Sequence, residues 1–272
     1  MEITSVVENT SGKALPVEHG LSLYIKKNDG LSILFDMGQS SLFASNAEQL
    51  SLSVADVDIA VISHGHYDHG GGLATFLKEN RKAKVYVHNE SFQPHYSLRE
   101  NGLCYIGLDK QLENNNRLVF CRDLTRIGKD MIIFANVRGN ICNPPGNRLL
   151  FGPDEITNDT FSHEQNLIIG EKDNIVLFAG CAHCGIVNII HKMQETTGKV
   201  PTHVLAGMHL AKSGLEKSAE DAYIHSLAAE LGKYTETMFY TMHCTGQEQF
   251  RKLKSIMGSQ IEYLSCGDAL KI

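Results

Sequence analysis

The sequence lacks a long apolar run and a strong charge bias, and both absences narrow its function. Its start, Met1 to Ser5, has neither the basic residues nor the apolar core of a secretory signal, and no apolar stretch is long enough to cross a bilayer. The 25 basic and 31 acidic residues give a net charge of -6, which provides no broad attraction for nucleic acid or anionic membrane. We therefore expect a cytoplasmic protein that acts on a small molecule, without nucleic-acid or membrane partners.

Cysteine is too scattered for a disulfide framework. Seven cysteines, an odd number, are spread between Cys104 and Cys266, so we interpret them as mostly reduced thiols. No period of 20 to 50 residues repeats, and no low-complexity linker divides the 272 residues. With 42% hydrophobic and 21% charged residues, the composition is that of an ordinary globular protein. We expect one domain over residues 1–272.

Short apolar runs alternate with helix-like segments in both halves of the chain. The order strand, helix, strand is expected over residues 58–62, 73–80 and 84–88, and again over 175–179, 186–196 and 203–206. Residues 89–164 differ, because they are rich in Asn, Gly and Pro. They predict that an insertion within 89–164 forms a lid or side wall over the site.

The most informative motif follows the first of these apolar runs. His64, His66, Asp68 and His69 fall within six residues, before the glycines at 70–72. If the chain stays extended, His64 and His66 point the same way, while Asp68 and His69 lie around the turn. This arrangement suits two adjacent cations, one held by each pair. Imidazole ligands favour zinc, with iron or manganese as alternatives, so we expect one or two divalent ions.

The order His-x-His-x-Asp-His resembles the signature of the metallo-β-lactamase fold superfamily. The resemblance implies an α/β fold, a four-layer αββα sandwich with a metal site, but it does not imply a substrate. The alternative to a metal site is a solvent-exposed His-rich turn. Such a turn would require neither this order of residues nor this position at a strand end.

Two metal ions need further ligands at other strand ends. His183, in Gly180-Cys181-Ala182-His183, is our choice to complete the site of His64 and His66, with His163 as the alternative. For the second ion we prefer His243, which follows an apolar strand. His209 is the other candidate for this ligand, and it could instead contact substrate as a catalytic residue.

Cys181 departs from the superfamily pattern. In many members a Gly-Asp pair after this strand supplies a carboxylate that bridges both metals, whereas this chain has Gly180-Cys181. Cys181 could bridge as a thiolate, bind one ion or only pack. A redox role for Cys181-x-x-Cys184 is a further reading, but it would not explain the distant His-rich motif.

Four residues are secondary candidates. Asp36 could orient a metal ligand by accepting a hydrogen bond from its second ring nitrogen, or it could simply form a turn. His19 could contact substrate or a bound water. Thr245 and Gly246 could bind an anion at the start of a helix, or only cap it.

Several phrases outside the main motif resemble a narrower branch, the metal-dependent hydrolase subgroup that includes dihydropterin ribofuranosylaminobenzene 5'-phosphate synthases. The matching phrases are Glu18-His19-Gly20-Leu21-Ser22, Phe35-Asp36-Met37-Gly38, Gly180-Cys181-Ala182-His183, Gly207-Met208-His209-Leu210 and His243-Cys244-Thr245-Gly246. The branch implies a second hypothesis, a transferase that joins a pterin methyl carbon to an aminobenzene ring.

Our leading hypothesis is a metal-dependent hydrolase that attacks a small phosphate-bearing or ester-like substrate with metal-activated water. Asp68 would orient that water as a catalytic residue and a metal ligand, and His209 or His19 would assist the leaving group. A non-catalytic metal-dependent sensor is the third hypothesis, and it predicts tight ligand retention without turnover.

Overall fold

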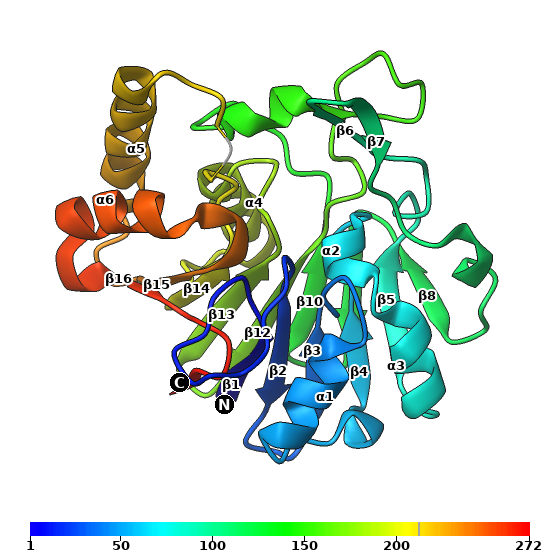
Figure 1. Cartoon of the computed structure of the whole chain (residues 1–272). Coiled ribbons are helices and arrows are strands. Elements are labelled where there is room, and N and C mark those ends of the chain that lie inside the picture. Colours follow the sequence, from blue (N-terminus) through cyan, green and yellow to red (C-terminus); the bar gives the residue numbers. More distant parts are fainter. Residues whose placement is uncertain (212) are drawn as a thin grey trace.

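Two seven-stranded sheets stand face to face in the computed structural model, which describes residues 1–211 and 213–272 (Figure 1). The strands of the first sheet, in spatial order, are β17 (Ala269–Lys271), β1 (Glu2–Val7), β2 (Ser22–Lys26), β3 (Ser32–Phe35), β4 (Ile59–Val61), β5 (Lys84–His88) and β8 (Leu118–Cys121). Those of the second are β16 (Ile261–Tyr263), β15 (Met238–Thr241), β14 (His203–Ala206), β13 (Asn174–Ala179), β12 (Asn166–Glu171), β10 (Met131–Phe134) and β9 (Leu124–Ile127).

Each sheet combines an antiparallel part with a parallel part. Strands β3, β4, β5 and β8 run parallel, as do β13, β14, β15 and β16. Parallel strands covered on both faces are apolar at nearly every position, and all four residues of β3 are buried. This explains why residues 58–62, 175–179 and 203–206 could be recognised as short continuous apolar runs.

Helices cover the outer face of each sheet (Figure 1). The helices are α1 (Leu42–Gln49), α2 (Tyr67–Gly70), α3 (Leu73–Glu79), α4 (Ile186–Thr197), α5 (Lys217–Leu231) and α6 (Gln247–Met257). Side chains of α1 and α3 pack on the first sheet, and those of α4, α5 and α6 on the second. A third apolar cluster lies between the sheets, where the rings of Phe35 and Phe178 are 5.9 Å apart. The predicted four-layer αββα sandwich is therefore confirmed.

Residues 89–164 contribute to the main sheets as well as to a separate structure. Strand β8 is an edge of the first sheet, and β9 and β10 extend the second. A small third sheet consists of β6 (Tyr96–Arg99), β7 (Gly102–Tyr105) and β11 (Leu150–Phe151), next to the 3-10 helix η3 (Pro145–Leu149). The remaining 3-10 helices are η1 (Val54–Asp56), η2 (Lys110–Leu112), η4 (His243–Thr245) and η5 (Gly258–Gln260). The residues of this region that stand apart from the two large sheets are those of the third sheet and η3.

The carboxyl ends of the parallel strands lead into the loops that carry the candidate site. Asp36 follows β3, the His-rich loop follows β4, and the segment from Gly180 follows β13. Ligands commonly bind beyond the carboxyl ends of strands in open α/β sheets. Three non-glycine residues of the loops after β13, β14 and β15 have left-handed backbone: Ala182 (φ 52°), His209 (φ 47°) and His243 (φ 51°). Non-glycine residues adopt this backbone infrequently, and it often marks functional sites.

Among the described residues, no helix is both long and apolar enough to cross a bilayer.

Candidate metal centre

Three imidazoles form the first group of donors. His64 and His66 come from the loop after β4, and His183 from the loop after β13. The Nε2 atom of His64 lies 3.0 Å from Nδ1 of His66, and one ring nitrogen of each of the three residues lies within 4.8 Å of the others. Burial and the neighbouring imidazoles hold the pKa of all three well below the ordinary value of a histidine. The rings are therefore neutral, as metal binding requires.

The position of His183 depends on residues that the sequence did not single out. Nδ1 of His183 lies 3.0 Å from Oδ1 of Asn147, and its ring stacks on Phe161 at 4.4 Å. Its backbone N–H donates to the buried Glu164 carboxylate at 2.6 Å, and that of Cys184 at 3.0 Å. Glu164 therefore holds the loop after β13. Nothing in the sequence distinguishes Asn147, and Glu164 was visible only as the neighbour of His163.

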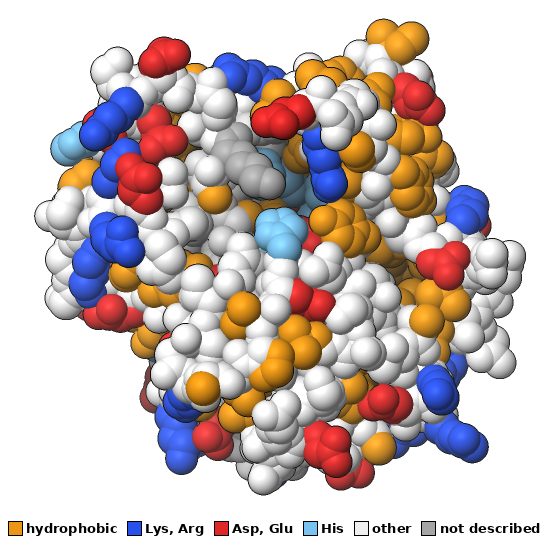
Figure 2. Space-filling model, in the orientation of Figure 1, with side chains coloured by type: hydrophobic (Ala, Val, Ile, Leu, Met, Phe, Trp, Pro, Cys, Tyr) orange, Lys and Arg blue, Asp and Glu red, His pale blue; other side chains and the backbone are white. Residues whose placement is uncertain are grey.

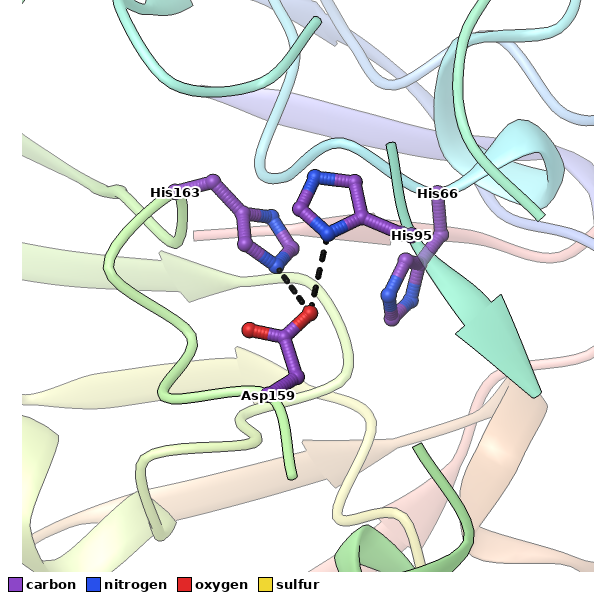
Figure 3. A group of neighbouring side chains, drawn as sticks. All are labelled: His66, His95, Asp159 and His163. Atoms are coloured by element: carbon purple, nitrogen blue, oxygen red, sulfur yellow. Dashed lines mark hydrogen bonds and ion pairs between the residues drawn. The ribbon is translucent and has the colours of Figure 1, made fainter. Parts of the chain in front are cut away.

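His163, the alternative third imidazole, lies with His95 and Asp159 in a separate group that shares only His66 with the first (Figure 3). The backbone N–H of Gly65 donates to its Nδ1 at 2.9 Å. Nδ1 must then be unprotonated, so Nε2 carries the proton and donates to Oδ2 of Asp159 at 3.1 Å. His95 contacts the same oxygen through Nδ1 at 2.9 Å. Both ring nitrogens of His163 are therefore engaged, and His183 is the candidate that joins His64 and His66.

A second group of donors surrounds Asp68. Its Oδ2 lies 3.3 Å from Nε2 of His243 and 3.9 Å from Nε2 of His69. The Sγ atom of Cys181 lies 3.1 Å from the same nitrogen of His69. Although burial alone would raise it, the pKa of Asp68 is held well below its usual range by His69, His19 and His243. Asp68 is therefore an ionised carboxylate.

The histidine rings share one orientation that suits metal binding. Nδ1 of His69 lies 2.7 Å from Oδ2 of Asp36, and Nδ1 of His243 lies 2.8 Å from Oδ1 of Asn9. Each Nδ1 donates to an oxygen, so that in the neutral ring Nε2 carries the lone pair that faces the site. The Nε2 atoms of His183 and His243 are buried and have no hydrogen-bond partner. Oxygen acceptors behind histidine ligands are typical of metal centres, so these residues fit divalent cations.

Cys181 lies between the two groups of donors. Its Sγ forms compact sets with His64 and His69 on one side, and with His183 and His209 on the other. Gly180 allows this approach, because a Cβ at that position would collide with the hydroxyl of Ser63 and lie 3.1 Å from Nδ1 of His64. The structure therefore places the Cys181 sulfur where the superfamily pattern leads us to expect a bridging carboxylate.

A cavity of about 1130 Å³ opens above these donors. Figure 2 shows histidine side chains inside this hollow. His19 is 46% exposed, and its Nε2 lies 3.1 Å from Oδ2 of Asp68. His209 is half-buried, with its ring 4.4 Å from that of His183. The third sheet supplies Arg99 and an apolar wall that includes Leu98.

Thr245 and Gly246, the candidates for an anion contact, lie in the turn that leads into α6. The Thr245 side chain is buried, and its hydroxyl accepts the Met208 N–H at 2.9 Å and lies 2.5 Å from the Thr241 hydroxyl. Thr245 is not among the described residues that line the cavity, and α6 begins without a side-chain capping bond. Gly246 is the residue before α6, and its positive φ of 79° allows the turn into that helix.

Comparison with known proteins agrees with this fold. The model of the metallo-β-lactamase superfamily matches residues 15–191, more than half of the chain. A 7,8-dihydropterin-6-methyl-4-(β-D-ribofuranosyl)-aminobenzene-5'-phosphate synthase of Methanocaldococcus jannaschii is 25% identical over 100% of this chain and 96% of its own. An uncharacterized protein of the same organism is 28% identical over 93% of this chain and 94% of its own.

Two solved structures show the same fold. Tm1679, described as a metal-dependent hydrolase of the β-lactamase superfamily, is 30% identical with a TM-score of 0.81, covering 100% of this chain and 99% of its own. An isothiocyanate hydrolase from Delia radicum gut bacteria is 12% identical with a TM-score of 0.59, over 100% and 99% of the two chains. This chain belongs to the metallo-β-lactamase superfamily.

Proposed function

We propose that the protein is a metal-dependent hydrolase that acts on a small phosphate-bearing or ester-like substrate. One observation carries the proposal: two groups of metal donors, with the Cys181 sulfur between them, form the floor of a cavity of about 1130 Å³. The superfamily consists mostly of metal-dependent hydrolases, and the relative Tm1679 is described as one.

The two groups of donors would hold one ion each. His64, His66 and His183 would bind the first ion, and Asp68, His69 and His243 the second. Zinc suits these imidazole, carboxylate and thiolate donors. A bound divalent ion would supply Lewis acidity and lower the pKa of a water molecule.

Asp68 and the cavity histidines would guide protons during the reaction. The Asp68 carboxylate can accept a hydrogen bond and so orient an attacking water. His19 reaches both Asp68 and solvent, because its Nε2 contacts Oδ2 at 3.1 Å while nearly half of its side chain is exposed. His209 lines the same cavity beside His183. Either imidazole could give a proton to the leaving group.

The cavity wall favours a substrate with an anionic end and an apolar body. Arg99 is the one lysine or arginine among the described residues that line the cavity, and Glu100 lies next to it in the same wall. Leu98, Ile106, Leu149 and Leu150 provide apolar surface beside it. A guanidinium group pairs well with phosphate or carboxylate oxygens, so Arg99 would bind the anionic end.

The test is a substrate panel on protein loaded with zinc, comprising a phosphodiester, a phosphomonoester, a lactone and a thioester. We expect turnover of at least one ester and loss of that turnover in Asp68→Ala. Relative to the unsubstituted protein, Arg99→Ala should raise the KM of anionic substrates more than that of neutral ones. Arg126→Ala, an exposed residue of β9 at the far edge of the second sheet, is the matched control. Unchanged turnover by metal-loaded Asp68→Ala would contradict the role of that residue.

A synthase-like transferase is the second candidate, because the synthase relative matches this chain from end to end. The same metal groups would then orient two substrates without water as the nucleophile. Incubation with a dihydropterin and the ribosylated aminobenzene phosphate, followed by mass spectrometry of the products, separates the two candidates. A condensed product together with an inactive hydrolase panel would favour the transferase.

A further inference from the structure

A second thiol lies beside the Asp68 group. Cys244 directly follows His243, and its side chain is buried. One donor atom each of Cys181, His243 and Cys244 lies within 4.8 Å of the other two. Cys244 also lines the cavity above the site. None of the functions proposed above uses this thiol.

The glycine after β14 allows the two thiols to approach. Strand β14 lies between β13, which leads to Cys181, and β15, which leads to Cys244. A Cβ on Gly207 would stand 2.6 Å from the Cys244 sulfur and 2.9 Å from the carbonyl oxygen of Gly180. Any larger residue would push the loops after β13 and β15 apart. The fold therefore brings two cysteines from separate strand ends to one side of the site.

Backbone groups of two loops contact the Cys244 sulfur, which also lies 3.8 Å from the Cys181 carbonyl oxygen. The His209 N–H donates to Sγ of Cys244 at 3.2 Å, from a residue with left-handed backbone (φ 47°). The N–H groups of Leu210 and Ala211 both donate to the Cys244 carbonyl oxygen at 3.0 Å. The loop is thus wrapped closely around this one residue. An N–H bond to a thiolate is stronger than one to a neutral thiol, and thiolates are the form that binds metals.

We propose that Cys244 is a second thiolate ligand of the Asp68 site, which then offers Cys181, Cys244, His69, His243 and Asp68 to its ion. Two thiolates make this site much softer than one built from imidazole and carboxylate alone. Soft sulfur donors select zinc or similar borderline ions, whereas magnesium and manganese prefer oxygen. The site therefore selects zinc or ferrous iron over manganese. This inference rests on the candidate metal centre and is independent of the reaction proposed for it.

The test is the absorption of protein loaded with cobalt(II) under anaerobic, reducing conditions, since thiolate ligands give cobalt an intense near-ultraviolet charge-transfer band. The variants are Cys181→Ser and Cys244→Ser. The control is Cys121→Ser, a buried thiol at the end of β8 in the core between the sheets. Circular dichroism verifies that each variant is folded.

We expect the band to fall to about half in each site variant and to stay unchanged in the control. A full band in folded Cys244→Ser overturns the proposal. If Cys244→Ser does not fold, Cys181→Ser gives an independent answer. In that variant the charge-transfer band that remains must come from Cys244, so complete loss of the band also overturns the proposal. Zinc and manganese competition provides the second readout. Cys244→Ser should lose about 10-fold or more in zinc affinity with manganese affinity unchanged, and this loss does not depend on turnover.

Discussion

Asp36→Asn should show how much a residue that orients a metal ligand contributes to metal affinity, while every proposed metal ligand is kept. Asp36 is fully buried, and its carboxylate accepts the Ser63 N–H at 2.6 Å, the Ser63 hydroxyl at 2.7 Å and Nδ1–H of His69 at 2.7 Å. An Asn has nearly the same shape and tolerates the positive φ of 61° at this position. Its amide nitrogen, however, cannot accept a hydrogen bond. If its oxygen stays with the Ser63 N–H, its NH₂ group faces His69.

The consequence for His69 is a change of tautomer. Facing an NH₂ group, Nδ1 becomes an acceptor, and the proton moves to Nε2, which can then no longer bind an ion. A hydrogen bond to a buried charge contributes about 1.5–3 kcal/mol, so we expect a loss of about 2 kcal/mol in the free energy of unfolding. Loss of such a supporting carboxylate typically lowers metal affinity by about 10- to 100-fold.

Urea unfolding of the metal-free protein and competition with a zinc chelator measure the two effects separately. Asp58→Asn is the control, because this half-exposed carboxylate accepts the Ser32 N–H at 3.0 Å and lies away from the site. It should change stability slightly and zinc affinity not at all. Zinc affinity in Asp36→Asn equal to that of the control would refute the reasoning.

Three further predictions follow from the same contacts. His183→Ala should lose one zinc per chain by elemental analysis, whereas His163→Gln should keep full zinc stoichiometry; equal losses would contradict the assignment of His183. Phe178→Ala should destabilise the fold by about 3–5 kcal/mol in guanidinium unfolding, because this fully buried ring packs between the sheets against Phe35, and a loss below about 1 kcal/mol would show that the seam is loosely packed. The metal-free protein should lose stability between pH 7 and pH 5, because burial lowers the pKa of His64 and His183 in the folded chain while the unfolded chain takes up protons near 6.5. Denaturant midpoints in the presence of a chelator measure that loss, and a midpoint that rises on acidification would contradict it.

The sequence was most informative where local pattern and strand ends coincide. The apolar runs predicted the bounds of β5 and β14, and the run at 175–179 predicted β13 to within one residue. His64 and His66 could be paired because an extended chain with period two places alternate side chains on one face. The choice between His163 and His183 could not be made this way. It depends on which ring nitrogens are already hydrogen-bonded, and those partners are as far away as Gly65 and Asn147.

Long-range contacts were the part that sequence patterns did not reveal. The role of Glu164 depends on two backbone N–H groups about twenty residues away, and Asn9 contacts His243 across most of the chain. Cys244 was visible only as the neighbour of a histidine, since its contact with Cys181 results from the order of β13, β14 and β15 in the sheet. Residues 89–164 were hardest to interpret, because their short strands join three different sheets and so share no single pattern.

The donors of each group come from both large sheets, and this division has a consequence for assembly. His64, His66, Asp68 and His69 follow a strand of the first sheet, whereas Cys181, His183 and His243 follow strands of the second. Neither sheet alone can complete either group, so an ion at this edge would cross-link the loops of the two sheets. Metal binding would then report that the two halves of the chain have docked. Removal of the metal by a chelator should therefore increase amide hydrogen exchange in the loops after β4 and β13. The increase should be larger there than in the core around Phe35 and Phe178.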